Sequence, residues 1–97
     1  MKESDDKIMT RNPDKNKKGV NIDRAKYDTI KHAIIKCLRK QELSAFQMFD
    51  QIKESLNGKF DGSINWYGET VKLDLEARGL IERIPDSKPQ LYRLIKK

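Results

Sequence analysis

The chain has almost none of the side chains from which disulfides and zinc sites are built. Cys37 is the only cysteine and His32 the only histidine among 97 residues. A single cysteine excludes an internal disulfide and a cysteine-rich zinc site. No nucleophile or carboxylate pair is placed to work with His32 as a catalytic base. We therefore expect no enzyme activity, no metal, no cofactor and no small-molecule substrate.

Long hydrophobic runs are also missing. Apolar residues make up 36% of the chain and charged residues 37%, and no segment approaches the roughly 18 consecutive apolar residues of a membrane span. The first six residues, Met-Lys-Glu-Ser-Asp-Asp, lack the apolar segment of a secretory signal. We expect one small cytoplasmic domain with no membrane partner.

The positive charge is not concentrated in any one region. The net charge is +6, and residues 1–26 hold eight bases against five acids, a net of +3. Residues 27–62 hold six bases against five acids, and residues 63–97 hold seven against five. A polyanion partner is compatible with this balance, and so is an ordinary solvated surface.

Residues 1–22 form a polar, partly flexible N-terminal arm, and residues 23–97 form the folded domain. The arm has few apolar residues and contains Pro13 and Gly19, so it cannot build a core alone. The alternation from Val20 to Ile22 predicts a short extended segment that lies on the domain. The basic run at residues 15–18 is either a phosphate contact or a solvated loop.

Two helices open the domain. Asp23 can cap a helix that runs to about Lys40, with its apolar face at Tyr27, Ile30, Ile34, Cys37 and Leu38. We expect a buried Cys37 and a surface His32 on this helix. Residues 41–43 are long enough only for a turn or a brief first strand.

The second helix begins after Ser44, which has capping-box spacing to Gln47, and ends at the Asn-Gly pair of residues 57–58. Its apolar stripe contains Ala45, Phe49, Ile52 and Leu56, and we expect Phe46 and Met48 to pack in the core as well.

The third helix spans about Asn65 to Arg78, with Ser63 or Asn65 as its cap and Gly79 as its stop. At about 100° per residue, one apolar face contains Ile64, Tyr67, Val71, Leu75 and Arg78. A second arc contains Trp66, Thr70, Leu73 and Ala77, and the solvated stripe contains Asn65, Glu69, Lys72 and Glu76. The helix should therefore be covered on two sides.

Two β-prone runs, residues 80–84 and 90–95, predict a C-terminal hairpin with a short turn. Their alternation points Leu80, Tyr92 and Leu94 toward the helices. The same alternation points Arg83, Lys88 and Arg93 outward, where the short turn limits their reach.

Helix, short strand, helix, helix and hairpin over Asp23 to Ile95 resemble a winged helix-turn-helix domain. The whole chain also resembles a small, uncharacterised bacterial family of that fold. The residues that carry this closer likeness are Arg11-Asn12-Pro13, Gly19, Ile22-Asp23, Lys26-Tyr27, Trp66, Thr70-Val71, Leu73-Asp74-Leu75-Glu76-Ala77 and Gly79. The resemblance implies an α+β fold with three helices, a C-terminal β-hairpin wing and an N-terminal arm that belongs to the domain. It implies no activity.

The first functional hypothesis is a double-stranded-DNA-binding protein, such as a transcriptional regulator, that uses its third helix and wing. Asn65, Tyr67 and Lys72 would lie near base edges. Ser44 and Gln47 would approach one phosphate, and Lys88 and Arg93 would approach the backbone from the wing. Glu69 and Glu76 oppose this hypothesis, because two acids beside a single lysine repel phosphate. The alternative interpretation of this stripe is that Glu69, Lys72 and Glu76 form ion pairs on a solvated helix.

The alternative hypothesis is a protein-interaction or dimerisation module of the same fold that does not bind DNA. It is favoured by the second arc of the third helix, where Trp66, Leu73 and Ala77 need a cover. The cover is either the N-terminal arm or a second copy in a homodimer. The arm would act through Ile8, Met9, Val20 and Ile22, and we expect at least Val20 and Ile22 to contribute.

Overall fold

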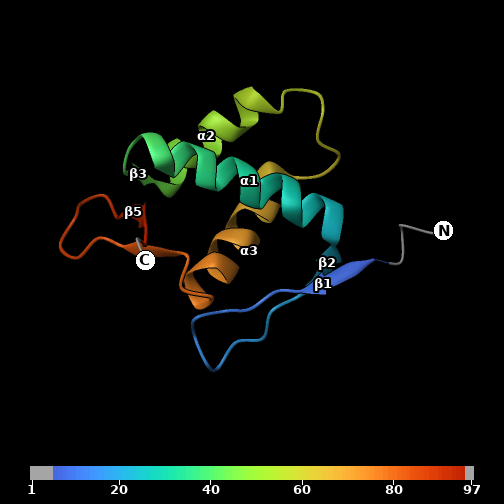
Figure 1. Cartoon of the computed structure of the whole chain (residues 1–97), viewed down its shortest axis with the longest axis horizontal. Helices are drawn as coiled ribbons and strands as arrows, with labels where there is room; N and C mark the ends of the chain where they lie inside the picture. Colours follow the sequence, from blue (N-terminus) through green and yellow to red (C-terminus); the bar gives the residue numbers. More distant parts are fainter. Residues whose placement is uncertain (1–5, 96–97) are drawn as a thin grey trace.

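The computed structural model of the protein describes residues 6–95, so residues 1–5 of the predicted arm and residues 96–97 lie outside it. Within residues 6–95 the chain forms three α-helices and two small antiparallel sheets, which confirms the predicted α+β class (Figure 1). None of these helices has the length and apolar character that crossing a membrane requires. The elements in chain order are β1 Lys7–Met9, β2 Asn21–Asp23, α1 Arg24–Lys40, β3 Leu43–Ser44, α2 Ala45–Ser55, α3 Ile64–Ala77, β4 Ile81–Arg83 and β5 Leu91–Leu94.

The first two helices begin where side chains satisfy the free N–H groups of the first turn. The N–H of Lys26 donates to the Asp23 carboxylate at 3.1 Å at the start of α1. At the start of α2, the N–H of Gln47 donates to the Ser44 hydroxyl at 3.2 Å. The N–H of Ser44 donates in return to the Gln47 side-chain oxygen at 3.0 Å. Both predicted caps, including the capping box, are confirmed.

The ends of α3 are set in the same local way. The N–H of Trp66 donates to the Ser63 hydroxyl at 3.1 Å, so Ser63 is the cap and the helix begins one residue before Asn65. Gly79 adopts a φ of 78°, the left-handed conformation that glycine tolerates best. The N–H of Leu80 then reaches back to the carbonyl of Leu75 at 2.9 Å. This Schellman-type ending turns the chain directly into the hairpin.

The larger sheet has the strand order β3-β5-β4, so the short strand between α1 and α2 pairs with the C-terminal hairpin. Leu43 lies opposite Tyr92, and Ile81 lies opposite Leu94. The predicted brief strand and hairpin are therefore both confirmed. Ile81 is the most buried residue of β4, whereas Leu80, which was expected to face the helices, is half-buried beside it.

The hydrophobic core lies between the three helices and the inner side of this sheet. α1 packs against both α2 and α3, and β5 packs against α1. The buried apolar residues are Ile22, Tyr27, Ile30, Ile34, Leu38, Leu43, Met48, Ile52, Val71, Leu75, Ile81 and Tyr92. This set contains most of the predicted α1 face, Val71 and Leu75 of the predicted α3 face, and Ile22 from the arm. The other predicted residues of the α3 face, Ile64, Tyr67 and Arg78, are half-buried.

Two core predictions are wrong. Met48 is fully buried, but Phe46 is 80% exposed. Residues two apart on a helix are separated by about 200°, so Phe46 and Met48 cannot face the same core. Cys37 is half-buried rather than buried, because it lies at the edge of the α1 face beside the groove to α2. His32 is exposed, as predicted.

The N-terminal arm, residues 6–22, is more ordered than the sequence indicated. β1 and β2 pair as an antiparallel hairpin in which Ile8 lies opposite Ile22. Beyond this pair, the Thr10 N–H and hydroxyl donate to the Val20 carbonyl at 2.8 and 3.0 Å, and the Val20 N–H donates to the Thr10 hydroxyl at 2.9 Å. Ile22 is 5% exposed but Val20 is 38% exposed. The arm therefore reaches the core through Ile22, with Ile8 half-buried against it, and Val20 stays largely outside.

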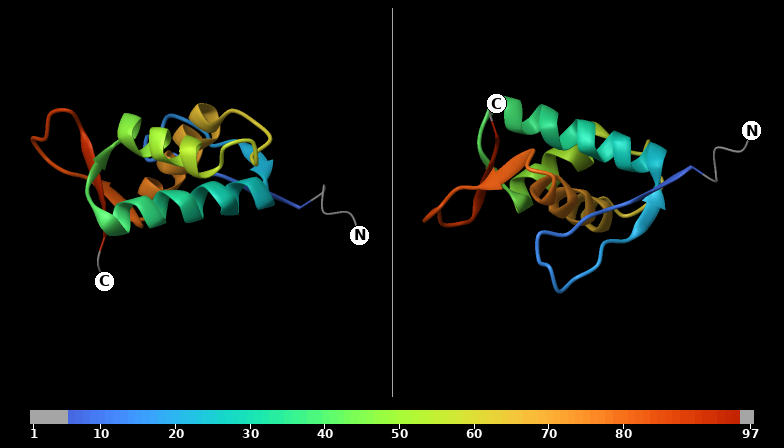
Figure 2. Two further views of the ribbon diagram at one scale, coloured as in Figure 1. Left: turned by 90° about the horizontal axis from the view of Figure 1, so that it is seen from above. Right: turned by 60° about the horizontal axis from the view of Figure 1, so that its bottom comes forward.

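The arm passes alongside α3 on the side away from α1 (Figure 2). Arm residues and the α3 residues Thr70 and Leu73 line one small cleft between the two segments. The arm therefore covers the Leu73 part of the second arc, as predicted. It leaves Trp66 48% exposed, so the expected cover of the tryptophan is absent within residues 6–95.

Gly19 is required where the two segments of the N-terminal hairpin, before and after the loop, approach each other. A methyl group at this position would lie 1.7 Å from the Thr10 carbonyl oxygen, which is part of the backbone and cannot move away cheaply. Gly19→Ala should therefore lower the free energy of unfolding by about 1–3 kcal/mol and raise amide exchange at Thr10 and Val20. Asn16→Ala, in the exposed loop of the arm, is the control and should change neither. Normal exchange protection in Gly19→Ala would contradict this packing.

Candidate nucleic-acid interface

Lys72 was predicted to lie on the solvated stripe of α3, but its side chain is buried. It is 1% exposed, and its ammonium donates to Glu76 Oε2 at 3.1 Å and to the Tyr92 hydroxyl at 3.3 Å. Glu69 Oε2 lies 3.6 Å away. The β-hairpin packs over this side of α3 and encloses the lysine. Lys72 is therefore held inside the molecule and cannot approach a base edge in this arrangement.

Glu76 links the same cluster to the hairpin. Its second carboxylate oxygen accepts from Arg83 Nε at 2.8 Å, while Lys72 holds the first. This hydrogen bond raises the pKa of Arg83, so its guanidinium stays charged. The Glu76 side chain is only 9% exposed. Glu76 is thus a bridge between α3 and β4 rather than a free acid on the stripe.

Asp74 is a second buried charge on α3, and helical periodicity did not predict its burial. It is 0% exposed and accepts from the backbone N–H of Arg11 at 2.8 Å and from the Tyr27 hydroxyl. Arg78 Nε donates to both carboxylate oxygens, at 2.9 and 2.8 Å. The arm, α1 and α3 therefore meet at one carboxylate. The signal available in the sequence was an aspartate about 60° from Val71 on the helical wheel, at the edge of the apolar face, with a basic residue one turn later at Arg78.

These contacts change the ionisation of the partners of Asp74. Burial, together with the hydrogen bond to Asp74, raises the pKa of Tyr27 to about 12. The hydrogen bond to Asp74 also raises the pKa of Arg78. Arg78 was placed on the apolar face of α3, and it is half-buried there only because its guanidinium reaches this carboxylate.

The exposed surface of α3 is therefore narrower than predicted and lies near its N-terminal end. Asn65, Trp66 and Glu69 are exposed, and Tyr67 is half-buried between the rings of Trp66 and Phe60. The two ring pairs are edge-to-face, with centroids 5.0 and 5.3 Å apart. Leu73 and Ala77 are half-buried on the arm side. Of the predicted base-contacting residues, only Asn65 presents its side chain freely.

The predicted phosphate contacts at the start of α2 are occupied by the capping box. Ser44 is buried in β3 and its hydroxyl accepts from the Gln47 N–H. Gln47 is exposed, but its side-chain oxygen accepts from Ser44. Both residues therefore stabilise the start of α2, and their capping hydrogen bonds already use the groups that were predicted to contact a phosphate.

Lys88 and Arg93 of the C-terminal hairpin are exposed, as predicted, but the prediction that Arg83 points outward is wrong. Arg83 shares the face of β4 with the buried Ile81, lies opposite Tyr92, and reaches Glu76 on α3. Lys88 lies in the exposed loop that projects from the helical body in both views of Figure 2, and it makes no ion pair with any residue of the described range 6–95. Arg93 is exposed and pairs with Glu82 across the β4–β5 ladder at 2.7 Å. Within residues 6–95 the hairpin therefore carries one free cation, Lys88, and two paired cations, Arg83 and Arg93.

A second basic segment lies on the other side of α3. The arm loop, residues 11–18, holds four bases against one acid, a net of +3. Its turn is ordered: the Asp14 N–H donates to Asn12 Oδ1 and the Asn16 N–H donates to Asp14 Oδ1, each at 2.9 Å. Such side-chain-to-backbone bonds are typical of asparagine and aspartate in turns. Arg11, Lys15, Lys17 and Lys18 are exposed and form no ion pair within the described part of the chain.

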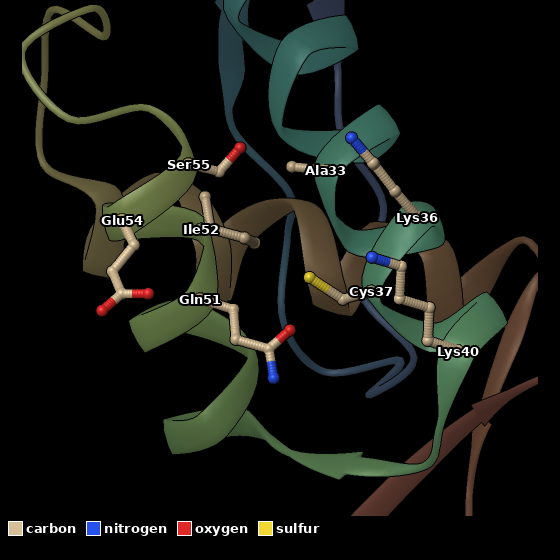
Figure 3. Close-up of a pocket in the computed structure, with 8 residues that line it drawn as sticks. All are labelled: Ala33, Lys36, Cys37, Lys40, Gln51, Ile52, Glu54 and Ser55. Carbon is tan, nitrogen blue, oxygen red and sulfur yellow. The ribbon is translucent and has the colours of Figure 1, made fainter.

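A separate open groove of about 560 Å³ lies between α1 and α2 (Figure 3). Cys37, Lys36 and Lys40 line it from α1, and Gln51 and Glu54 line it from α2. Burial raises the pKa of the Cys37 thiol, so the thiol is protonated and poorly nucleophilic at neutral pH. Among residues 6–95, no group of three or more His, Cys, Asp or Glu side chains is placed to hold a metal ion.

Tyr27 should make stability depend on pH in the alkaline range. Its folded pKa of about 12 exceeds its ordinary value of 10.0, so its contribution is complete below pH 10 and is lost as pH rises toward 12. Tyr27→Phe should cost roughly 1–2 kcal/mol at pH 8, and the deficit relative to wild type should shrink by about 1.4 kcal/mol per pH unit above pH 10. Urea denaturation from pH 8 to 11.5 measures this deficit. A deficit that does not vary with pH would contradict the Tyr27–Asp74 assignment.

Comparisons with known proteins identify the family of the chain. No curated protein and no solved structure matches it. Residues 7–92 match one family model, which covers the arm, the three helices and most of the hairpin. The match includes Arg11, Tyr27 and Asp74, the three residues that join the arm to the helices. The chain belongs to this family, which is described as a family of unknown function (DUF6958).

Proposed function

We propose that the chain is a winged-helix protein that binds double-stranded DNA and acts as a transcriptional regulator in the cytoplasm. Three helices followed by a hairpin, with a short strand between the first two helices, have the element order of that fold. In that fold the third helix enters the major groove and the hairpin forms the wing. The proposal therefore places α3 against the DNA bases and the β4–β5 loop against the backbone.

The observation that carries the proposal is the arrangement of charge around α3. α3 lies between two basic segments, the arm loop on one side and the hairpin with Lys88 and Arg93 on the other (Figure 2). Asn65 and Glu69 are exposed on this helix. Phosphates border the major groove on both sides, so a helix flanked by cations on both sides is complementary to it. The arm loop acts in this proposal as a second wing.

The acidic residues of α3 do not oppose this arrangement as strongly as the sequence indicated. Asp74 is neutralised by Arg78, and Glu76 by Lys72 and Arg83. Glu69 is the acid that remains exposed on the stripe. The N-terminal end of α3 also carries the positive end of the helix dipole, which favours an approach to phosphate.

The arm restricts which part of α3 reaches the bases. The major groove is about 12 Å wide and a helix with side chains is about 10–12 Å across, so little else fits beside a fully inserted helix. The arm lies against Thr70 and Leu73, near the middle of α3. The N-terminal half of the helix, with Asn65, is therefore the part that would contact base edges.

A protein-interaction or homodimerisation module is the second candidate, and two exposed aromatic residues favour it. Phe46 is 80% exposed and Trp66 is 48% exposed, whereas large aromatic side chains are enriched at protein interfaces. Light scattering and the emission wavelength of Trp66 over a range of protein concentrations distinguish this candidate. Association that buries Trp66, together with no DNA binding at low salt, would favour the module over the DNA-binding protein.

DNA binding should depend steeply on salt. A handful of free cations in the arm loop and the hairpin supply the contacts, so a plot of log K against log salt should have a slope of about −4 to −6. Fluorescence anisotropy with a labelled mixed-sequence duplex at two or more salt concentrations measures this slope. Absence of binding at 50 mM salt or below would refute the proposal.

Glu69→Gln should tighten binding by removing the exposed acid from the stripe. The change takes one repulsive charge away from the phosphates, and a few-fold gain in affinity is expected at low salt. Lys72 keeps Glu76 as its close partner, so the fold should be unaffected. Glu54→Gln makes the same charge change beside the α1–α2 groove and is the matched control. Equal effects of the two variants would mean that α3 does not face DNA.

A further inference from the structure

The arm and α3 enclose a cleft of about 70 Å³, which has room for a few water molecules or one phosphate group but not for a base or a sugar ring. The arm contributes both of its paired segments to the lining, and α3 contributes its arm-facing side. The lining residues are Thr10, Arg11, Asn12, Lys18, Gly19, Val20, Thr70 and Leu73.

The cleft has the side chains that bind an oxyanion. Arg11 and Lys18 line it from the two sides of the arm loop, and neither makes an ion pair within residues 6–95. The half-buried Thr70 hydroxyl forms no hydrogen bond with the residues the structure describes, so it can donate one. A guanidinium with a fixed fork of donors and a lysine ammonium are the usual protein partners of phosphate.

No carboxylate lines this cleft among the described residues. The acid that contacts a lining residue is Asp74, whose carboxylate accepts a hydrogen bond from the Arg11 N–H. Its charge is already matched by the Arg78 guanidinium and by the Tyr27 hydroxyl. An anion in the cleft would therefore meet two unpaired cations and no free acid.

The backbone around the cleft is held in place before any ligand arrives. The Arg11 N–H is bound to Asp74, and Thr10 is bound to Val20 on the opposite side of the hairpin. Gly19 allows the two segments to approach closely. A site that is ordered in advance loses less entropy on binding than a free loop does.

We propose that this cleft binds one phosphate group of the DNA backbone, between Arg11, Lys18 and Thr70. This inference rests on the proposed function and assigns a specific contact to it. Thr70 follows the exposed Glu69 on α3 and points about 100° away from it, so a phosphate held here would lie on the arm-facing flank of the helix. The site would fix how deeply the N-terminal half of α3 enters the groove, as backbone contacts do in DNA recognition.

The first test is a set of single substitutions in the full chain. Arg11→Ala and Lys18→Ala should each weaken duplex binding by about 5- to 10-fold near 0.1 M salt and should reduce the steepness of the log K against log salt plot by about 1. Lys36→Ala, beside the α1–α2 groove, removes the same charge and is the matched control. Thr70→Val, which keeps the side-chain shape, should weaken binding without changing the salt slope.

The second test uses inorganic phosphate and a 12-base-pair duplex as separate probes in amide NMR titrations. Each probe should shift the Gly19 and Thr70 amides of the wild type, and the phosphate-induced shifts should be lost in Arg11→Ala. Amide protection at Thr10 confirms that the variant keeps its arm, because the Arg11 N–H remains.

The outcomes separate the site from the wider function. If phosphate shifts these amides but the duplex does not bind, the DNA-binding proposal fails and the oxyanion site stands. If the duplex binds but Arg11→Ala and Lys18→Ala change its affinity no more than Lys36→Ala does, the cleft is not a phosphate contact. The DNA-binding proposal would stand in that case. If phosphate shifts neither Gly19 nor Thr70, the site is refuted.

Discussion

The buried carboxylate of Asp74 is the group on which the relative position of the arm, α1 and α3 depends. A charge without solvent costs several kcal/mol unless it is paired and its lone pairs accept hydrogen bonds. Here one donor comes from each of three segments: the Arg11 backbone, the Tyr27 hydroxyl and the Arg78 guanidinium. If any of the three moved away, the carboxylate would be left partly unsatisfied. The arm is therefore part of the domain and not an appendage.

A second buried cluster holds the opposite side of α3. Lys72 is enclosed by Glu76 and Tyr92, and Glu76 also holds Arg83 of β4. α3 is thus tied to the hairpin on one side and to the arm on the other by charged groups. Most of its charged residues have structural partners, and this leaves only the N-terminal half of the helix to present side chains to a ligand. Its function must be sought in that half and in the two basic segments beside it.

Much of the local structure could be predicted from the sequence. The caps at Asp23 and Ser44, the glycine that ends α3 and the hairpin after it depend on neighbours within a few residues, and the structure confirms each of them. The apolar faces of α1 and α3 followed from helical periodicity for the same reason. Phe46 was predicted to pack in the core but is exposed. The helical wheel places it beside the apolar stripe of α2, and a residue beside the stripe does not necessarily face the core.

The surface of α3 was decided by tertiary structure alone. A helical wheel gives the direction of a side chain but not what lies in that direction. Lys72 and Glu76 were predicted to be exposed because the sequence does not show that the hairpin packs over them. The partners of Asp74 could not be predicted either, since Tyr27 and Arg11 lie 47 and 63 residues away in the chain. The pairing of β1 with β2 was missed because three-residue strands carry almost no pattern of their own. The sequence by itself determined where the helices begin and end, whereas only long-range packing determined which charges remain free to bind a partner.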